Sequence, residues 1–137
     1  MIQLYSLKII LKNLRELIEI DPKERISNPE EIIPLEINAY TNRKALKHII
    51  NSRQHDGYNQ DKLLQMFIRT GEVVENPHST IPNHNRKYPQ SLISNRNYGE
   101  NQTLLVIHIP IATQQFIFNA FYRHRTKYEK LRKRSKY

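Results

Sequence analysis

The sequence predicts an α+β fold in which N-terminal helices pack on a C-terminal antiparallel sheet of about four strands. The first half of the chain has apolar residues at spacings of three and four, which is typical of amphipathic helices. The second half has β-prone segments separated by turn residues. The chain has 137 residues, a length that suits one domain with a single core.

The chain begins with a predicted amphipathic helix over residues 2–20. Asp21-Pro22 ends this helix, because the residue before a proline avoids the helical conformation. A loop rich in Pro and Glu follows, and residues 1–40 carry five basic and seven acidic side chains. We therefore divide the chain into an N-terminal helix with an acidic linker, 1–40, and an α+β domain, 41–137. The sequence leaves open whether residues 1–40 belong to the core, mediate dimerisation or dock another protein.

A second helix is predicted over residues 43–55, where Thr41 or Asn42 can cap the start and Gly57 can stop the helix. Its apolar side chains lie on one face, and its histidines share another face with lysine. This is the most informative stretch of the chain, because imidazole and cationic groups gather on one surface.

A third helix is predicted over residues 60–70, with Asn59 as its cap and Gly71 as its stop. A short strand at Glu72–Glu75 follows. The segment Asn76–Pro89 contains prolines and two histidines, and it is predicted as an ordered loop or an active-site flap.

The remaining segments are predicted to form an antiparallel meander. Ser91–Asn95 is a weak strand, and a turn at 97–101 leads to strong strands at Gln102–Ile109 and Gln115–Arg125. The end of the chain, Tyr128–Lys136, is predicted as a basic helix or a disordered tail.

The net charge of +9 favours an anionic partner such as nucleic acid. Residues 121–137 carry eight basic side chains and one acidic one, a net of +7, with tyrosines between them. Phosphates pair with cations and bases stack on aromatic rings, so this segment suits single-stranded nucleic acid. The predicted RNA-binding residues are Lys44, Arg123, Arg125, Lys127, Lys130 and Arg132.

Several classes of protein lack support in the sequence. The absence of cysteine excludes a disulfide framework and thiolate chemistry. No run of roughly 18 apolar residues predicts a membrane span, and charged residues interrupt the first twenty positions, unlike a secretory signal. No Gly-rich phosphate loop, HExxH helix or nucleophile elbow is present. We expect a protein without metal or organic cofactor that acts in the cytoplasm.

Acid–base chemistry is predicted on the polar face of the second helix. At 100° per residue, His48 and His55 fall within about 20° of each other, and Lys44 and Asn51 share that face. A neutral imidazole can remove a 2′-OH proton, a cation can hold the phosphate, and a second acid can protonate the leaving 5′-oxygen. Arg53 falls in the apolar stripe and must reach a partner, because an unpaired buried guanidinium is costly. The alternative is a solvated helix face with two ordinary histidines.

A second set of polar residues lies on the last predicted strand. Alternation puts Asn119 and Arg123 on the same face as Ile117, and Tyr122 on the opposite face with Phe118. Tyr122 and Arg123 are donors of the kind that a phosphate site at a sheet end needs. The alternative is an exposed polar sheet face.

The layout of these motifs resembles a known superfamily. Lys47-His48-Ile49, Arg53-Gln54-His55, a short helix, an Asn76-Pro77 loop and two terminal strands are similar to the barnase, EndoU, colicin-type and RelE-like ribonucleases, in particular their phage-encoded and polymorphic-toxin branches. The resemblance covers about residues 40–128. It implies a helical layer on a four-stranded antiparallel sheet, and metal-independent cleavage of RNA such as tRNA to a 2′,3′-cyclic phosphate. It also implies an immunity protein or antitoxin as a partner, often an acidic one.

The resemblance implies roles for individual residues. His48 takes the position of the general base or acid, and the nearby cations surround the phosphate. Asn119 stands at a late-strand position where the family has Ser or Thr, and Gln54 separates Arg53 from His55. With Tyr122 added from the strand pattern, the predicted catalytic set is Lys47, His48, Arg53, His55, Asn119 and Tyr122.

Two other functions remain open. A non-catalytic nucleic-acid-binding protein of a phage or mobile element would use the same basic residues without cleaving RNA. An all-α nuclease marked by Arg-x4-His fits Arg43 and His48, although the β-rich second half argues against that fold. His108 projects with the apolar Leu104 and Val106, which is more typical of a core residue than of a catalyst.

Overall fold

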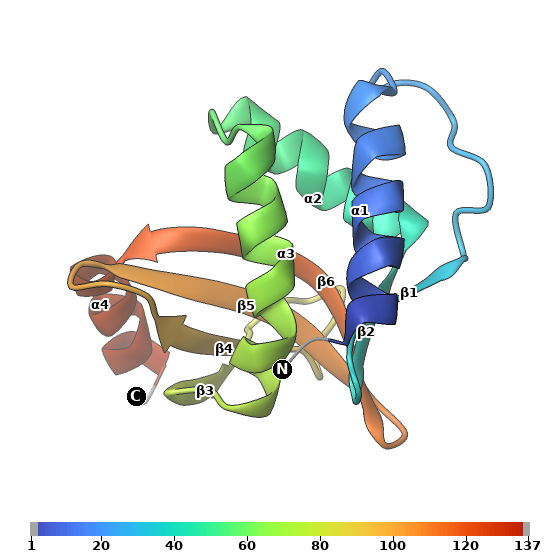
Figure 1. Cartoon of the computed structure of the whole chain (residues 1–137). Helices are drawn as coiled ribbons and strands as arrows, with labels where there is room; N and C mark the ends of the chain where they lie inside the picture. The colour runs from blue at the N-terminus through green and yellow to red at the C-terminus, as the bar shows by residue number, and fades with distance from the viewer. Residues whose placement is uncertain (1–2, 136–137) are drawn as a thin grey trace.

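The computed structural model describes residues 3–135 and confirms the α+β class (Figure 1). The helices are α1 (Leu4–Glu19), α2 (Arg43–His55), α3 (Gln60–Glu75) and α4 (Arg125–Ser135). The strands are β1 (Ile32–Glu36), β2 (Ala39–Asn42), β3 (Ser79–Pro82), β4 (Leu92–Asn97), β5 (Gln102–Ile111) and β6 (Gln114–His124). None of the helices within residues 3–135 has the length and apolar composition needed to cross a membrane.

The described strands form one six-stranded sheet in the order β1-β2-β6-β5-β4-β3. β4 to β6 form the predicted antiparallel meander, and β3, which lies in the segment predicted as a loop or flap, extends it by pairing with β4. β2 pairs with β6 in parallel. β1 and β2 lie mostly in the segment predicted as a linker, so the predicted boundary at residue 40 falls inside β2. Pro34 argues against a strand at this position in the sequence. β1 tolerates the proline because it is an edge strand, where a missing backbone N–H costs no ladder hydrogen bond.

Helices α1, α2 and α3 cover one face of the sheet, as predicted (Figure 1). The main core lies in this layer and includes Leu14 of α1, Phe67 of α3 and Val106 of β5. Ile33 and Leu35 of β1 belong to the same cluster. α1 and β1 therefore contribute to the core of this domain.

Helix α4 packs on the opposite face of the sheet. Tyr128 is buried there against Ile81, Ile93 and Leu105, in a second and smaller cluster. The Tyr128 hydroxyl lies 2.5 Å from the Ser79 hydroxyl, and burial raises the pKa of Tyr128. The C-terminal segment is thus a docked helix rather than a tail, and its buried tyrosine is not available to stack on a base.

Helix α3 is longer than the sequence predicts. It continues to Glu75, so the stop at Gly71 and the strand at Glu72–Glu75 are wrong. Gly71 is buried in the helix interior, where an added Cβ would lie 2.8 Å from the Leu35 carbonyl oxygen and closer still to the Glu36 side chain. The glycine therefore lets α3 approach β1 closely, and it is not a helix cap.

Candidate functional site

A cavity of about 570 Å³ lies between the first turns of α2, the middle of β6 and the loop after β3. Lys44, His48 and Asn119 line it together, although they come from α2 and β6. We call it the His48 cavity. Its other lining residues are Glu30, Asn42, Ala45, Asn83, Asn85, Lys87, Tyr88, Ile107, Phe116 and Phe118.

Two hydrogen bonds position the start of α2 beside β6. The Asn42 side chain caps the helix, as predicted, by accepting from the Ala45 N–H at 2.8 Å. The Thr41 hydroxyl donates to the Ile117 carbonyl oxygen at 2.7 Å in a buried contact. Lys44 and His48 are exposed and four residues apart, so they are neighbours on the helix face that lines the cavity.

A β-bulge in β6 places Asn119 in the cavity. Ile107 pairs with Asn119, whereas His108 pairs with Ile117, so Phe118 is an extra residue in β6. An extra residue inverts the alternation of side chains along a strand. The predicted faces are therefore wrong in this part of β6: Ile117 lies in the helix-covered core with Ala120, and Phe118 lines the His48 cavity with Asn119.

The lining of the His48 cavity includes three aromatic rings and four asparagine amides. The Tyr88 and Phe118 rings lie 5.0 Å apart at an angle of 45°, and the Lys87 Nζ lies 5.5 Å from the Tyr88 ring centre. Amides offer donors and acceptors, and rings offer a stacking surface, which together suit a nucleobase. Glu30 adds a carboxylate to the imidazole of His48, so the cavity has both a proton acceptor and a proton donor.

Lys47 lies elsewhere, on the buried side of α2. Its Nζ donates to the carbonyl oxygens of Leu17, at 2.5 Å, and of Ile20. Burial lowers the pKa of Lys47, an effect that the nearby Asp21 and Glu24 oppose. The prediction that Lys47 lies beside the phosphate is therefore wrong, because its ammonium group binds the C-terminal end of α1.

Arg53 is hydrogen-bonded and ion-paired, as its position in the apolar stripe of α2 requires. Its Nη1 donates to the Ala120 carbonyl oxygen at 2.9 Å, and its Nε lies 3.1 Å from the Asp56 carboxylate. The guanidinium also lies over the Phe121 ring, 5.3 Å from the ring centre. Arg53 thus joins α2 to β6 and does not line the His48 cavity. His55 is exposed in the last turn of α2 and does not line it either.

Arg43 ties α2 to α1 and to the segment before β1. It is 5% exposed, bonded to Asn13 and Glu16 of α1, and its Nε donates to the Ser27 carbonyl oxygen at 3.0 Å. These bonds leave Arg43 in a structural role. Together with the six-stranded sheet, they contradict the alternative of an all-α Arg-x4-His nuclease.

A second cavity, of about 440 Å³, lies at the C-terminal end of β6. It is lined by Tyr58, Lys62, Asn101, Gln102, Tyr122, Arg123 and His124. We call it the Tyr122 cavity. The Tyr122 hydroxyl accepts a hydrogen bond from the Arg69 Nη1 at 3.0 Å. The predicted catalytic set is therefore divided, with His48 and Asn119 in one cavity and Tyr122 in the other.

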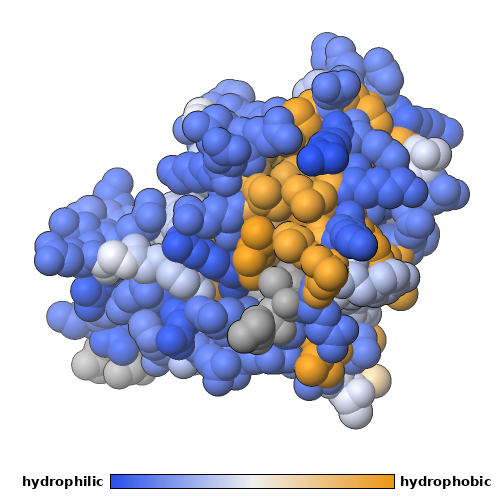
Figure 2. All heavy atoms as spheres, viewed as in Figure 1, coloured by the Kyte–Doolittle hydropathy of each residue, from blue (hydrophilic) through white to orange (hydrophobic). Residues whose placement is uncertain are grey.

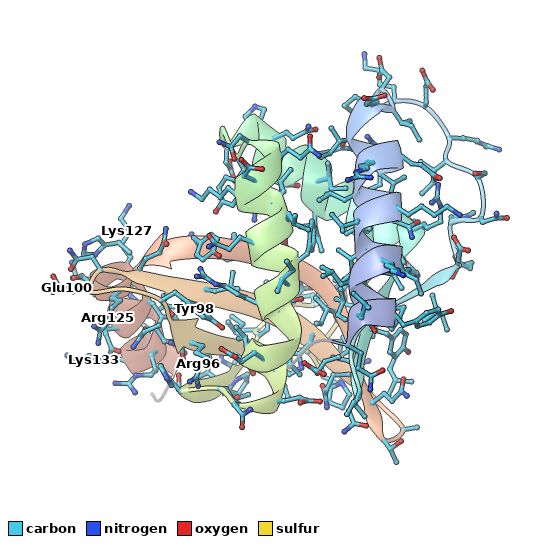
Figure 3. The ribbon with its side chains drawn as sticks, viewed as in Figure 1. Arg96, Tyr98, Glu100, Arg125, Lys127 and Lys133 are labelled. Carbon is cyan, nitrogen blue, oxygen red and sulfur yellow. The ribbon has the colours of Figure 1, made fainter. Side chains whose placement is uncertain are left out.

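The predicted RNA-binding cations of the C-terminal segment lie on α4. Lys127 and Lys130 are exposed, whereas Arg132 pairs with Glu129 at 2.6 Å. Arg125 donates to the Glu100 carbonyl oxygen at 3.0 Å, which joins the start of α4 to the β4–β5 turn. Figure 3 shows Arg125, Lys127 and Lys133 at the same end of the sheet as Arg96 and Tyr98.

His108 lies in the core, as its position among apolar residues predicts. It is 3% exposed, with its Nε2 2.8 Å from the Ser94 hydroxyl and its Nδ1 2.7 Å from the Gln115 side-chain oxygen. Burial lowers the pKa of His108, which favours the neutral ring. Within residues 3–135 no group of three or more His, Asp or Glu side chains is arranged to hold a metal ion.

The sequence prediction missed several residues that line the cavities. Lys87 and Tyr88 lie in the loop predicted as an active-site flap, and that prediction was the only indication that they lie near a site. Glu30 lies in the predicted linker, where no periodic or capping pattern distinguishes it from its neighbours. Tyr58 and Lys62 flank the α2–α3 turn, and only their contact with β6 brings them to Tyr122.

Comparison of the chain with known protein families, with curated proteins and with solved structures finds no match.

Proposed function

We propose that this chain is an endoribonuclease that cuts RNA in the His48 cavity. The observation that carries the proposal is that His48, Lys44 and Asn119 line one cavity together with the carboxylate of Glu30 and aromatic walls. Cleavage of RNA through its own 2′-hydroxyl needs a base, an acid and a cation for the phosphate. The cavity contains all three kinds of group.

In the proposed reaction, the Glu30 carboxylate takes the proton of the 2′-hydroxyl. The 2′-oxygen forms a bond to phosphorus, and the bond from phosphorus to the 5′-oxygen breaks. The His48 imidazolium gives its proton to that leaving oxygen. The products are a 2′,3′-cyclic phosphate and a free 5′-hydroxyl, and the reaction needs no metal ion.

Two lysines and one amide support this chemistry. Lys44 and Lys87 lie around the cavity, where their charge stabilises the negative charge that develops on the phosphate. Tyr88 and Phe118 offer ring faces to the base on the 5′ side of the cut. The Asn119 side-chain oxygen accepts from the Ala120 N–H at 2.9 Å, so its NH₂ group is left to donate to a base or a phosphate.

The proposal extends to the class of enzyme and to its partner. By the proposed reaction and the residues around His48, the chain is similar to the barnase, EndoU, colicin-type and RelE-like ribonucleases of toxin type, and we place its RNA target in the cytoplasm. A cell that makes such an enzyme needs an inhibitor. An acidic immunity protein or antitoxin fits best, because a net charge of +9 accelerates association with an acidic surface.

Cleavage of a tRNA by the purified chain in EDTA tests the proposal. His48→Gln removes the proton donor, and we expect the cleavage rate to fall by about 100-fold or more. His78→Gln is the matched control, because His78 is exposed and lies outside both cavities. Undiminished cleavage by correctly folded His48→Gln would exclude His48 as the acid, and loss of wild-type cleavage in EDTA would exclude the metal-independent reaction.

A second candidate is a non-catalytic nucleic-acid-binding protein. The exposed cations of α4 favour it, because they lie away from the His48 cavity and need no chemistry to bind phosphates. This function predicts RNA binding that weakens linearly with the logarithm of the salt concentration, and no cleavage products. The tRNA assay therefore distinguishes the two candidates.

A further inference from the structure

The tyrosines of the Tyr122 cavity are held in place by their polar ends. The Tyr58 hydroxyl accepts from the Tyr122 N–H at 2.9 Å, and the Tyr122 hydroxyl accepts from Arg69 at 3.0 Å. The two rings lie 6.2 Å apart, centre to centre, at an angle of 33°. Both rings line the cavity, so their faces are fixed before any ligand arrives.

Cations surround these rings. The Lys62 Nζ lies 4.2 Å from the centre of the Tyr58 ring and 5.6 Å from that of Tyr122. Arg123 is exposed at the cavity wall, and its guanidinium lies over the Phe121 ring. A nucleotide that stacks its base on a tyrosine ring therefore finds a cation within reach of its phosphate.

The basic surface continues from the cavity toward α4. Arg125 N–H donates to the carbonyl oxygen of Asn101, which lines the cavity, and its guanidinium binds the Glu100 carbonyl oxygen. Figure 3 shows Arg125 and Lys127 at this end of the sheet. A phosphate chain that leaves the cavity therefore finds further cations at the start of α4.

We propose that the Tyr122 cavity is a subsite for one unpaired base of single-stranded RNA. The base stacks on the ring of Tyr122, and the adjoining phosphates contact Lys62, Arg123 and the start of α4. The subsite deepens the proposed ribonuclease function, on which its biological role rests. Tyr122 is three residues beyond Asn119 on β6, about 10 Å along the strand, and the two side chains lie on opposite faces of that strand, so the subsite is separate from the His48 cavity.

The test measures binding of a fluorescein-labelled RNA hexamer with 2′-O-methyl groups, because methylation removes the nucleophile of the proposed reaction. Tyr122→Leu removes the ring, and we expect its affinity to fall about 10-fold. Tyr122→Phe keeps the ring and loses the hydroxyl, and we expect nearly wild-type affinity. Tyr5→Leu is the control, because Tyr5 is exposed on α1 and lines neither cavity.

A second pair of variants tests the subsite without altering a ring. We expect Lys62→Gln to weaken binding several-fold and to reduce the salt dependence by about one phosphate contact. Lys8→Gln, an exposed lysine on α1, should do neither. These variants keep the test decisive if Tyr122→Leu does not fold.

The outcomes separate the subsite from the ribonuclease. Equal affinity of Tyr122→Leu and Tyr122→Phe, with no effect of Lys62→Gln, would overturn the subsite even if cleavage depends on His48. Ring-dependent binding by a chain that cuts no RNA would overturn the ribonuclease and keep the subsite.

Discussion

Two cationic side chains of α2, Lys47 and Arg53, have structural roles because they bind backbone carbonyl groups. Lys47 donates to two carbonyl oxygens at the end of α1, and Arg53 donates to a carbonyl oxygen of β6. Carbonyl groups at a helix end lack partners within the helix and attract cations. Lys47 supplies such a partner to α1. His48 is one residue further on, about 100° around α2, where it is exposed and lines the cavity.

Replacing Lys47 should therefore affect stability rather than RNA binding. Lys47→Met keeps the length of the side chain but leaves the Leu17 and Ile20 carbonyl groups without their charged donor. We expect the free energy of unfolding, measured by urea denaturation, to fall by about 2 kcal/mol. Lys44→Met, on the exposed side of the helix, should change it by less than about 0.5 kcal/mol. A Lys47→Met variant with unchanged stability and impaired RNA binding would contradict the structural role and show that Lys47 contacts the phosphate.

At the scale of single elements, close approach and irregularity decide the structure. α3 passes near β1 at Gly71, and β6 contains a bulge at Phe118. Both features look like weaknesses when the elements are considered alone, because glycine destabilises a helix and an unpaired residue interrupts a strand. In the assembled layers, glycine permits the contact between α3 and β1, and the bulge turns Asn119 toward the His48 cavity.

Gly71→Ala tests the contact between α3 and β1. Alanine favours the helix by about 1 kcal/mol, but its methyl group would collide with the Leu35 carbonyl oxygen and the Glu36 side chain. We expect a net loss of about 2 kcal/mol in the free energy of unfolding, because overpacking exceeds the gain in propensity. Gln65→Ala, on the exposed side of α3, is the control and should be nearly neutral. A more stable Gly71→Ala protein would show that Gly71 serves no packing purpose.

At the scale of the whole molecule, apolar and basic surfaces are separated. Figure 2 shows a band of apolar residues over α1 and α3, whereas the end of the sheet beside α4 is hydrophilic. Leu4 and Ile37 are each 68% exposed. The Tyr122 cavity lies near the hydrophilic end, where the β4–β5 turn meets α4. The proposed RNA path therefore avoids the apolar band.

A chain of hydrogen bonds crosses the sheet and predicts how stability depends on pH. Thr80, Ser94, His108 and Gln115, from β3, β4, β5 and β6, are joined through their side chains. A neutral His108 that donates from Nδ1 to Gln115 and accepts at Nε2 from Ser94 satisfies both contacts. Protonation would replace the accepting nitrogen by a second donor.

Acidification should therefore destabilise the protein through His108. Burial lowers the pKa of His108 in the folded state, so the unfolded chain binds the proton more readily. The contribution of the neutral ring is complete above an unfolded-state pKa of about 6.5 and is lost as the pH falls below it. We expect the free energy of unfolding to decrease more between pH 8 and pH 5 in the wild-type protein than in His108→Gln. Equal decreases would exclude His108 as the source.

Local features of the sequence determined much of the fold. Apolar periodicity defined α1, the Asn42 cap defined the start of α2, and strand propensity and turn residues defined β4 to β6, because each of these signals acts over a few neighbouring residues. The family resemblance implied Asn119 as a catalytic candidate, and these local signals identified Lys44 and His48. They overlooked β1 and β2, whose stability comes from pairing with a strand far along the chain.

Only the tertiary structure decided which candidates share a site. Lys47 and His48 are adjacent in the sequence, yet one is bonded to the end of α1 and the other lines a cavity with Glu30 and Tyr88. Tyr122 does not share a cavity with His48, because its position at the end of β6 places it beside Lys62. Burial and hydrogen bonding depend on which elements meet in space, and for these residues the deciding partners lie on other elements of the chain.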